Sequence, residues 1–313
     1  MPDDSRNIRE GQASKFKARW WTSRDGLKLY YRDYAGPSGR PSARPPILCL
    51  SGLTRNSRDF ADLAEHYAGQ WRVIAPDFRG RGMSDHDPKS ARYLPTTYAA
   101  DVLQLLDELE IKQAVFVGTS LGGLVTMLIA GFQPRRIAAT VLNDVGPDLD
   151  QRGLDRIRGY VGKPVRFGNW DEAAKYIAGV NRGLPASNSH DDWLRAARRV
   201  CKEDGDGVVF DYDMAIAEPF NQRNDDAVTF DMWPLYRKLG DAPLLIVRGE
   251  LSDLLSAPVA QAMVVANPAA ELVTVPGVGH APVLSEPEAI AAIDRLLDRV
   301  VGQAPIDRGK GRQ

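Results

Sequence analysis

Ser120 is the residue whose neighbours best suit a nucleophile. It lies within Gly118-Thr119-Ser120-Leu121-Gly122, a G-x-S-x-G pattern with an apolar run before it and a helix-like run after it. A serine on a tight strand-to-helix turn needs room for the backbone on both sides, and glycines have no Cβ to obstruct that turn. Unpaired N–H groups at the start of the next helix would favour a developing negative charge. The pattern alone also fits a serine that only caps a helix, so the prediction depends on partners elsewhere in the chain.

His280 is the best candidate for the base that a serine nucleophile requires. The sequence has four histidines: His66, His86, His190 and His280. Only His280 follows the strand-like run 271–275 on a glycine-containing loop. Ligand sites of open parallel sheets form at the carboxyl ends of the strands, where Ser120 would also lie. We therefore predict that His280 accepts the proton of Ser120, and we interpret the other three as surface histidines.

Three carboxylates are candidates for the acid that orients this histidine. Asp253 lies in the loop after the apolar run 243–248 and precedes His280, which gives the chain order serine, aspartate, histidine. We predict that Asp253 is this acid. Asp144, which ends the preceding strand-like run, remains the alternative because it too would follow a core strand. Glu250 is interpreted as an ordinary loop carboxylate.

Two backbone N–H groups are predicted to bind the oxyanion of a tetrahedral intermediate. One belongs to Leu121, which directly follows the nucleophile. The other belongs to Leu53, beside Gly52 in the loop after the apolar run 47–50. Because the main chain supplies both donors, the side chains at these positions need not be polar.

The elements that must position these residues follow an alternating pattern. Two strand-like runs around the turn signal Asp25-Gly26 are followed by apolar strand-like runs that alternate with helix-like runs up to residue 144. The alternation resumes at residue 243, and it predicts a parallel sheet covered by helices. Between residues 148 and 235 the chain is helical in pattern, charged and aromatic. This stretch predicts a mainly helical insertion.

The composition argues against several classes of partner. The 313 residues include 40 lysines and arginines and 41 aspartates and glutamates, a net charge of −1, which gives no electrostatic case for nucleic acid or an anionic membrane. No apolar stretch is long enough for a membrane span, and the polar N-terminus does not resemble a secretory signal. Two cysteines, Cys49 and Cys201, make neither a disulfide framework nor a zinc site. We expect a cytoplasmic protein, monomer or homodimer, that acts on a small molecule without cofactor or metal.

Four motifs follow one another along the chain: Asp77-x-Arg79-Gly80-x-Gly82-x-Ser84, Gly118-Thr119-Ser120-Leu121-Gly122-Gly123, Arg248-Gly249-x-x-x-Asp253 and Gly279-His280. Together they resemble the α/β-hydrolase fold superfamily. The resemblance implies an α/β fold with a mostly parallel eight-stranded sheet flanked by helices and a short antiparallel start. It also implies a Ser120–His280–Asp253 triad and a helical cap over the site. The sequence departs from the family at Ser51-Gly52, where His-Gly is usual, and its acid loop is one residue longer than the commonest form.

The same resemblance implies the domain organisation. The predicted parts are a flexible N-terminus (1–15), an α/β-hydrolase core (16–147 and 236–301), a helical cap (148–235) and a flexible tail (302–313). Within the core, the Asp77–Gly82 loop is interpreted as a tight structural loop. No Lys-Ser/Thr pair follows its glycines, as a phosphate-binding loop would require.

The predicted cap is rich in aromatic side chains. Most are expected to pack within it, while two or three line the substrate pocket. The candidates for the pocket are Trp170, Tyr176, Trp193 and Phe220. Such a lining predicts a substrate with an apolar or aromatic part.

These features predict a serine hydrolase that cleaves a carboxylic ester or lactone of a small, partly apolar substrate through an acyl-enzyme on Ser120. The alternative is a carbon–carbon bond hydrolase of the type that cleaves meta-cleavage products of aromatic degradation. Those enzymes are similar in core and triad, but they usually have an aromatic residue after the histidine and asparagine before the serine. Here these residues are Ala281 and Thr119. A non-catalytic ligand receptor of the same fold is a third hypothesis, against which a complete triad argues.

Overall fold

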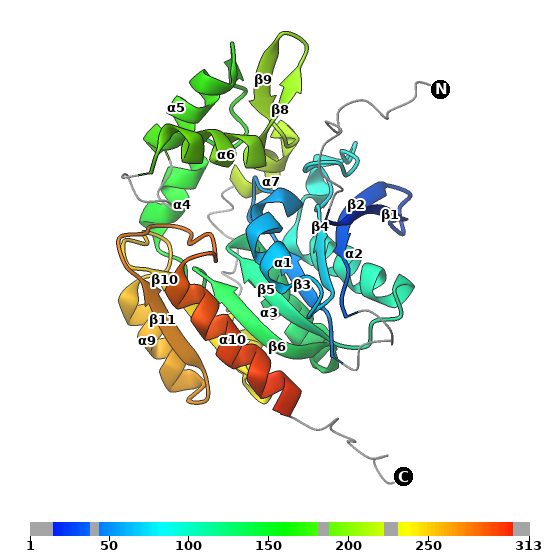
Figure 1. Cartoon of the computed structure of the whole chain (residues 1–313), viewed down its shortest axis with the longest axis vertical. Coiled ribbons are helices and arrows are strands. Elements are labelled where there is room, and N and C mark those ends of the chain that lie inside the picture. Colours follow the sequence, from blue (N-terminus) through cyan, green and yellow to red (C-terminus); the bar gives the residue numbers. More distant parts are fainter. Residues whose placement is uncertain (1–14, 38–43, 181–187, 222–230, 303–313) are drawn as a thin grey trace.

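The main element of the protein is a twisted eight-stranded sheet, seen in the computed structural model in Figure 1. The structure describes residues 15–37, 44–180, 188–221 and 231–302. The strands of the sheet are β1 (Lys17–Thr22), β2 (Lys28–Tyr34), β3 (Ile47–Leu50), β4 (Val73–Pro76), β5 (Ala114–Thr119), β6 (Ile137–Asn143), β10 (Leu244–Gly249) and β11 (Glu271–Val275). Most of both predicted flexible ends lies outside the described residues.

The strand order is β1-β2-β4-β3-β5-β6-β10-β11. The β1–β2 and β2–β4 pairs are antiparallel, and all other neighbours are parallel. The prediction of a mostly parallel eight-stranded sheet with an antiparallel start is therefore confirmed. The carboxyl ends of β5, β6, β10 and β11 consequently meet at one edge, where ligand sites of such sheets form.

Helices cover both faces of this sheet. They are α1 (Ala61–Tyr67), α2 (Pro95–Glu108), α3 (Leu121–Phe132), α8 (Trp233–Lys238), α9 (Ala257–Ala266) and α10 (Pro287–Gly302). Short 3-10 turns occur at Ser57–Phe60, Ser90–Arg92, Pro134–Arg136, Met214–Ile216 and Leu239–Asp241. Successive strand residues point to opposite faces, so Phe116 of β5 joins the core under α2, α3, α8 and α9. Its neighbours Val115 and Val117 join the core under α1 and α10.

The segment between β6 and α8 forms a separate layer at the carboxyl edge of the sheet (Figure 1). It contains α4 (Gln151–Arg158), β7 (Arg166–Phe167), α5 (Trp170–Val180), α6 (His190–Val200), β8 (Cys201–Asp204), β9 (Gly207–Phe210) and α7 (Ala217–Asn221). The strands make a small antiparallel sheet in the order β7-β9-β8. We expected a mainly helical insertion and missed β8, because three of its four residues are exposed and charged and show no apolar pattern.

Arg79 holds the Asp77–Gly82 loop in place. The structure therefore agrees with the interpretation of this loop as structural and not phosphate-binding. Its buried guanidinium contacts Asp25 at 2.8 Å, Asp87 at 2.5 Å and Asp101 at 2.7 Å. These carboxylates come from the β1–β2 turn, the loop after β4 and helix α2. One side chain therefore joins the loop after β4 to the β1–β2 turn and to helix α2.

Both cysteines are free and buried. Burial raises the pKa of the Cys201 thiol to about 12, so it stays protonated and unreactive at neutral pH. Within the part of the chain that the structure describes, no helix is long and apolar enough to cross a membrane.

Candidate active site

Ser120 lies on the turn between β5 and α3 in a strained backbone conformation, with φ 51° and ψ −116°. The neighbouring glycines permit this turn. A Cβ on Gly122 would lie 2.0 Å from the carbonyl oxygen of Leu50, and one on Gly118 would lie 2.6 Å from the backbone of Gly122. Any larger residue would push α3 away from the sheet. Strain of this kind concentrates at functional sites, and here it exposes the serine hydroxyl at the sheet edge.

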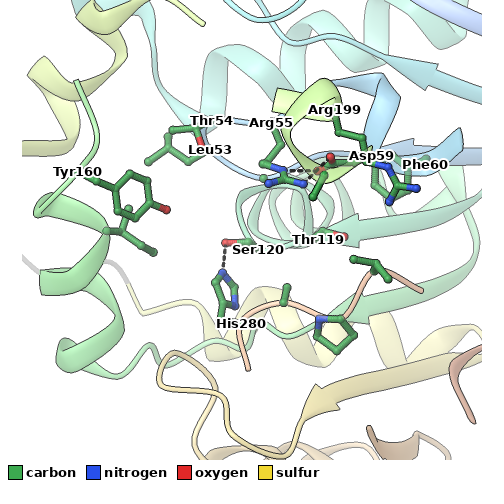
Figure 2. Close-up of a pocket in the computed structure, with 16 residues that line it drawn as sticks. Leu53, Thr54, Arg55, Asp59, Phe60, Thr119, Ser120, Tyr160, Arg199 and His280 are labelled. Carbon is green, nitrogen blue, oxygen red and sulfur yellow. Dashed lines mark hydrogen bonds and ion pairs between the residues drawn. The ribbon is translucent and has the colours of Figure 1, made fainter. Parts of the chain in front are cut away.

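His280 connects Ser120 to a buried carboxylate. The Nε2 atom of His280 lies 3.0 Å from the Ser120 hydroxyl oxygen, a contact drawn in Figure 2. Its Nδ1 atom lies 2.8 Å from a carboxylate oxygen of Asp144. The histidine comes from the loop after β11, as the sequence predicted. An N–H on Nδ1 that donates to Asp144 leaves Nε2 free to accept the serine proton.

Asp144, not Asp253, is the acid in contact with the histidine, so our first choice for this residue was wrong. The Asp144 side chain is fully buried at the end of β6. It accepts hydrogen bonds from the Gly249 N–H at 2.9 Å and the Ser252 hydroxyl at 2.7 Å, in addition to His280. These three donors satisfy the buried carboxylate oxygens and compensate for the loss of water.

Asp253 contacts the insertion instead. Its carboxylate forms a bidentate ion pair with Arg156 of α4, at 2.5 and 2.8 Å. The hydrogen bonds from Arg156 hold the pKa of Asp253 below its usual range. Glu250, the third candidate, accepts the Gly277 N–H at 2.8 Å and joins the loops after β10 and β11. Since β6 and β10 are adjacent, carboxylates after either strand reach the same edge, and the sequence alone could not choose between them.

Leu53 and Leu121 have positions that fit the two predicted oxyanion donors. Leu121 is the first residue of α3, and its N–H therefore has no acceptor within the helix. The Leu53 loop is fixed from both sides: Arg81 donates to the Leu53 carbonyl at 2.9 Å, and the Ser51 hydroxyl donates to the Arg55 carbonyl at 3.2 Å. Ser51 thus stabilises this loop through its hydroxyl group, at the position where α/β hydrolases usually have histidine.

Ser120 opens into a cavity of about 120 Å³ between the sheet edge and the insertion. The core contributes Ser120, His280 and Leu53 to its wall, and α4 and α6 contribute Ile157 and Ala196. Tyr160, just after α4, is also part of the wall. Burial raises the pKa of Tyr160, so its phenol remains a neutral hydrogen-bond donor at physiological pH.

The four aromatic residues predicted to line the pocket do not line it. Trp170 donates to Glu203 at 2.9 Å, and the ring of Tyr176 packs 5.3 Å from that of Phe167. Trp193 is 8% exposed within the core of the insertion. Phe220 packs beneath the guanidinium of Arg158. Trp170, Tyr176 and Trp193 pack with Ile177, Val200 and Val208 in the apolar core of the insertion itself, away from the cavity.

Sequence reasoning missed three charged residues of the cavity wall: Arg55, Asp59 and Arg199. Figure 2 shows them around the same cavity as Ser120. Arg55 directly follows the predicted oxyanion loop, so its place in the sequence was a usable signal. Arg199 gave none, since it is one of several arginines in a charged helix.

Comparison with known proteins identifies the family to which this chain belongs. Residues 47–293 match the model of the alpha/beta hydrolase family, and the chain belongs to that family of hydrolases. It is similar to a crystal structure of an alpha/beta hydrolase from Novosphingobium aromaticivorans, with 49% identity and a TM-score of 0.86 over 92% of this chain and 100% of that one.

Two curated relatives have more specific names. The chain is 32% identical over 271 residues to 3-hydroxybutyrate-oligomer hydrolase of Cupriavidus necator, covering 84% of this chain and 90% of that protein. It is 30% identical over 256 residues to 2-(acetamidomethylene)succinate hydrolase of Mesorhizobium japonicum, covering 81% and 88%.

Proposed function

We propose that this protein is a serine hydrolase that cleaves a carboxylic ester or lactone of a small molecule, with Ser120, His280 and Asp144 as its triad. The observation that carries the proposal is the continuous hydrogen-bonded chain from Asp144 through His280 to the Ser120 hydroxyl at the wall of a cavity. We propose that it needs no cofactor. We also propose that it acts in the cytoplasm, an expectation that rests on the sequence alone.

The proposed reaction has two halves. Ser120 Oγ attacks the ester carbonyl while His280 Nε2 takes its proton, and the N–H groups of Leu53 and Leu121 stabilise the oxyanion. The C–O bond of the ester then breaks, and His280 returns the proton to the departing alcohol. Water attacks the acyl-enzyme, with His280 again as base. This step releases the acid and restores the serine. Asp144 holds the imidazole and stabilises its protonated form.

Linear hydroxyacid esters are the first substrates to test. The relative named for 3-hydroxybutyrate oligomers acts, by its name, on such esters. The wall formed by α4 and α6 is partly apolar through Ile157 and Ala196 and partly charged through Arg199. We propose that the insertion acts as a cap that selects the substrate, while the sheet edge supplies the reacting groups.

Replacement of Ser120 with alanine tests the proposal directly. We expect kcat/KM on p-nitrophenyl butyrate to fall at least about 10⁴-fold, since the other triad members cannot act without the nucleophile. A fluorophosphonate probe should label the wild-type protein at Ser120 and not the variant. Turnover by the variant near the wild-type rate would refute the assignment. Absence of both labelling and turnover in the wild type would favour a non-catalytic receptor.

Carbon–carbon bond hydrolysis remains the alternative. Thr119 and Ala281 line the cavity at the positions where such enzymes usually carry asparagine and an aromatic residue. A vinylogous diketone and a simple ester should therefore be assayed side by side, and we expect turnover of the ester only.

A further inference from the structure

The charged side chains that line the cavity include more cations than anions. Among its charged side chains are two arginines, Arg55 and Arg199, and one aspartate, Asp59, before the catalytic histidine is counted. Charges beside a partly closed cavity act through a low dielectric and attract a ligand of opposite sign. An ester without charge would make no use of them.

Arg55 is held in one orientation close to the nucleophile. Its Nε and Nη2 atoms donate to the two carboxylate oxygens of Asp59 at 2.6 and 2.7 Å, a contact drawn in Figure 2. This bidentate pair leaves the Nη1 group outside the contact with Asp59. A Cβ on Gly52 would lie 3.4 Å from Arg55 Cγ and 3.7 Å from Ser120 Cβ. The side chains of Arg55 and Ser120 therefore lie on either side of the space beside Gly52 that a Cβ would occupy.

The Arg55–Asp59 pair differs from two other bidentate pairs, Arg156–Asp253 and Arg72–Asp33, in what it connects. Arg156 and Asp253 join the insertion to the core, and Arg72 and Asp33 join neighbouring segments of the sheet. Arg55 and Asp59 lie four residues apart in one segment. Their contact ties no distant elements together, and its main effect is to fix the plane of the guanidinium.

Arg199 brings a second cation to the cavity from the insertion. Its carbonyl accepts hydrogen bonds from Asn56 and Arg58, both at 3.1 Å, which anchors the end of α6 beside the Arg55 segment. Its guanidinium pairs with Asp62, whose side chain is 53% exposed. Pairs open to water are weak, so this contact does not hold Arg199 away from a charged ligand.

We propose that Arg55, assisted by Arg199, binds a carboxylate of the substrate, so that the natural substrates are esters carrying a free carboxylate. The inference rests on the proposed ester hydrolysis and adds a specificity determinant to it. The planar guanidinium donates hydrogen bonds to carboxylate oxygens and keeps its charge at every physiological pH. With the carboxylate at Arg55, the ester carbonyl of a short hydroxyacid dimer extends toward Ser120.

The experiment compares two substrates that differ only in charge. One is the linear dimer of 3-hydroxybutyrate, and the other is the same dimer with its carboxylate replaced by a primary amide. We expect the wild-type enzyme to prefer the acid over the amide by at least about tenfold in kcat/KM, with the difference mainly in KM, because charged hydrogen bonds are stronger than neutral ones.

The variant Arg55→Gln/Asp59→Asn removes both charges and leaves no unpaired carboxylate in the wall. We expect its acid-to-amide ratio to fall to within about threefold of one, because the charged contact is gone. Arg199→Gln should lower the ratio less. Arg72→Gln, which breaks a bidentate pair outside the cavity, is the matched control and should leave the ratio unchanged.

Equal use of both dimers by the wild type, or an equal loss on both in the double variant, would overturn the inference. Hydrolysis of p-nitrophenyl butyrate, measured in parallel, separates this result from failure of the proposed function. An enzyme active on that ester without discriminating between the dimers remains an esterase. An enzyme inactive on every ester would refute both the proposed ester hydrolysis and the binding of a substrate carboxylate by Arg55.

Discussion

Asp144 and Asp253 both lie near the histidine, but only Asp144 contacts it. Asp144 bonds His280 Nδ1 directly, whereas the carboxylate of Asp253 is occupied by Arg156. A carboxylate that fixes the imidazole tautomer acts on the chemical step, while one that holds α4 acts on the shape of the cavity. The two residues should therefore affect different kinetic constants.

We expect Asp144→Asn to lower kcat on p-nitrophenyl butyrate by about 10²–10⁴-fold, because the amide cannot stabilise the protonated histidine. Asp253→Asn should keep kcat within about fivefold and act mainly on KM, since it breaks a partly exposed ion pair. Steady-state kinetics of both variants check this, with circular dichroism as a control for folding. A larger loss of kcat in Asp253→Asn than in Asp144→Asn would restore Asp253 as the acid.

The structure brings together Ser120 and His280, two residues that local sequence patterns single out. Ser120 is marked by its glycines, and His280 by a glycine-containing loop after a strand. The sequence did not show which of the two carboxylates contacts the histidine. Asp253 is instead paired with Arg156 of α4, a residue almost a hundred positions earlier in the chain. Similarly, Trp170 and Trp193 have the size and polarity of pocket residues, and only the packing of the insertion shows that they fill its core.

At the scale of elements, the site depends on how closely α3 approaches β3. Gly122 faces the Leu50 carbonyl at a distance that excludes any Cβ. Because Gly122 has no side chain, α3 can pack closely enough to hold the serine turn against the sheet. The alternation of strands and helices was readable from the sequence, but the closeness of this contact appears only once the elements are packed.

Replacement of Gly122 with alanine should force α3 away from β3. We expect a loss of about 1–3 kcal/mol in the free energy of unfolding, from overpacking, together with lower activity. Gly179→Ala in α5 is the matched control, because a Cβ there meets nothing within 4 Å. That change should be neutral or slightly stabilising, since alanine favours a helix over glycine. Chemical denaturation measures both variants, and equal stabilities would contradict the account.

At the scale of the whole molecule, Arg79 and its carboxylates join the antiparallel start of the sheet to the parallel part. The hydrogen bond from Arg79 holds the pKa of Asp25 well below its usual range. A carboxyl group whose pKa is lowered by folding contributes stability above its unfolded pKa, near 3.9, and loses it as the pH falls toward the folded value. This ion pair should therefore stabilise the protein at neutral pH and not in strong acid.

We expect Asp25→Asn to lower the free energy of unfolding by about 1–2 kcal/mol at pH 7, toward the low end of the effect of hydrogen bonds to charged groups, because water partly screens the Asp25 carboxylate. The difference from wild type should shrink as the pH falls from about 4 toward 2. Urea unfolding across this range tests the prediction. Asp107→Asn, which breaks an exposed pair with Arg136, serves as control and should change stability little at any pH. A difference that persists in acid would show that Asp25 acts other than through its charge.

The different contacts of Asp144 and Asp253 have a consequence for protein engineering. In the proposed triad Asp144 supplies the carboxylate from β6, and the carboxylate at position 253 attaches α4 to the core through Arg156. Libraries that vary residues 156 and 253 together would alter how the insertion rests on the core while leaving the reacting groups in place. That pair is a natural point at which to redesign the range of accepted substrates.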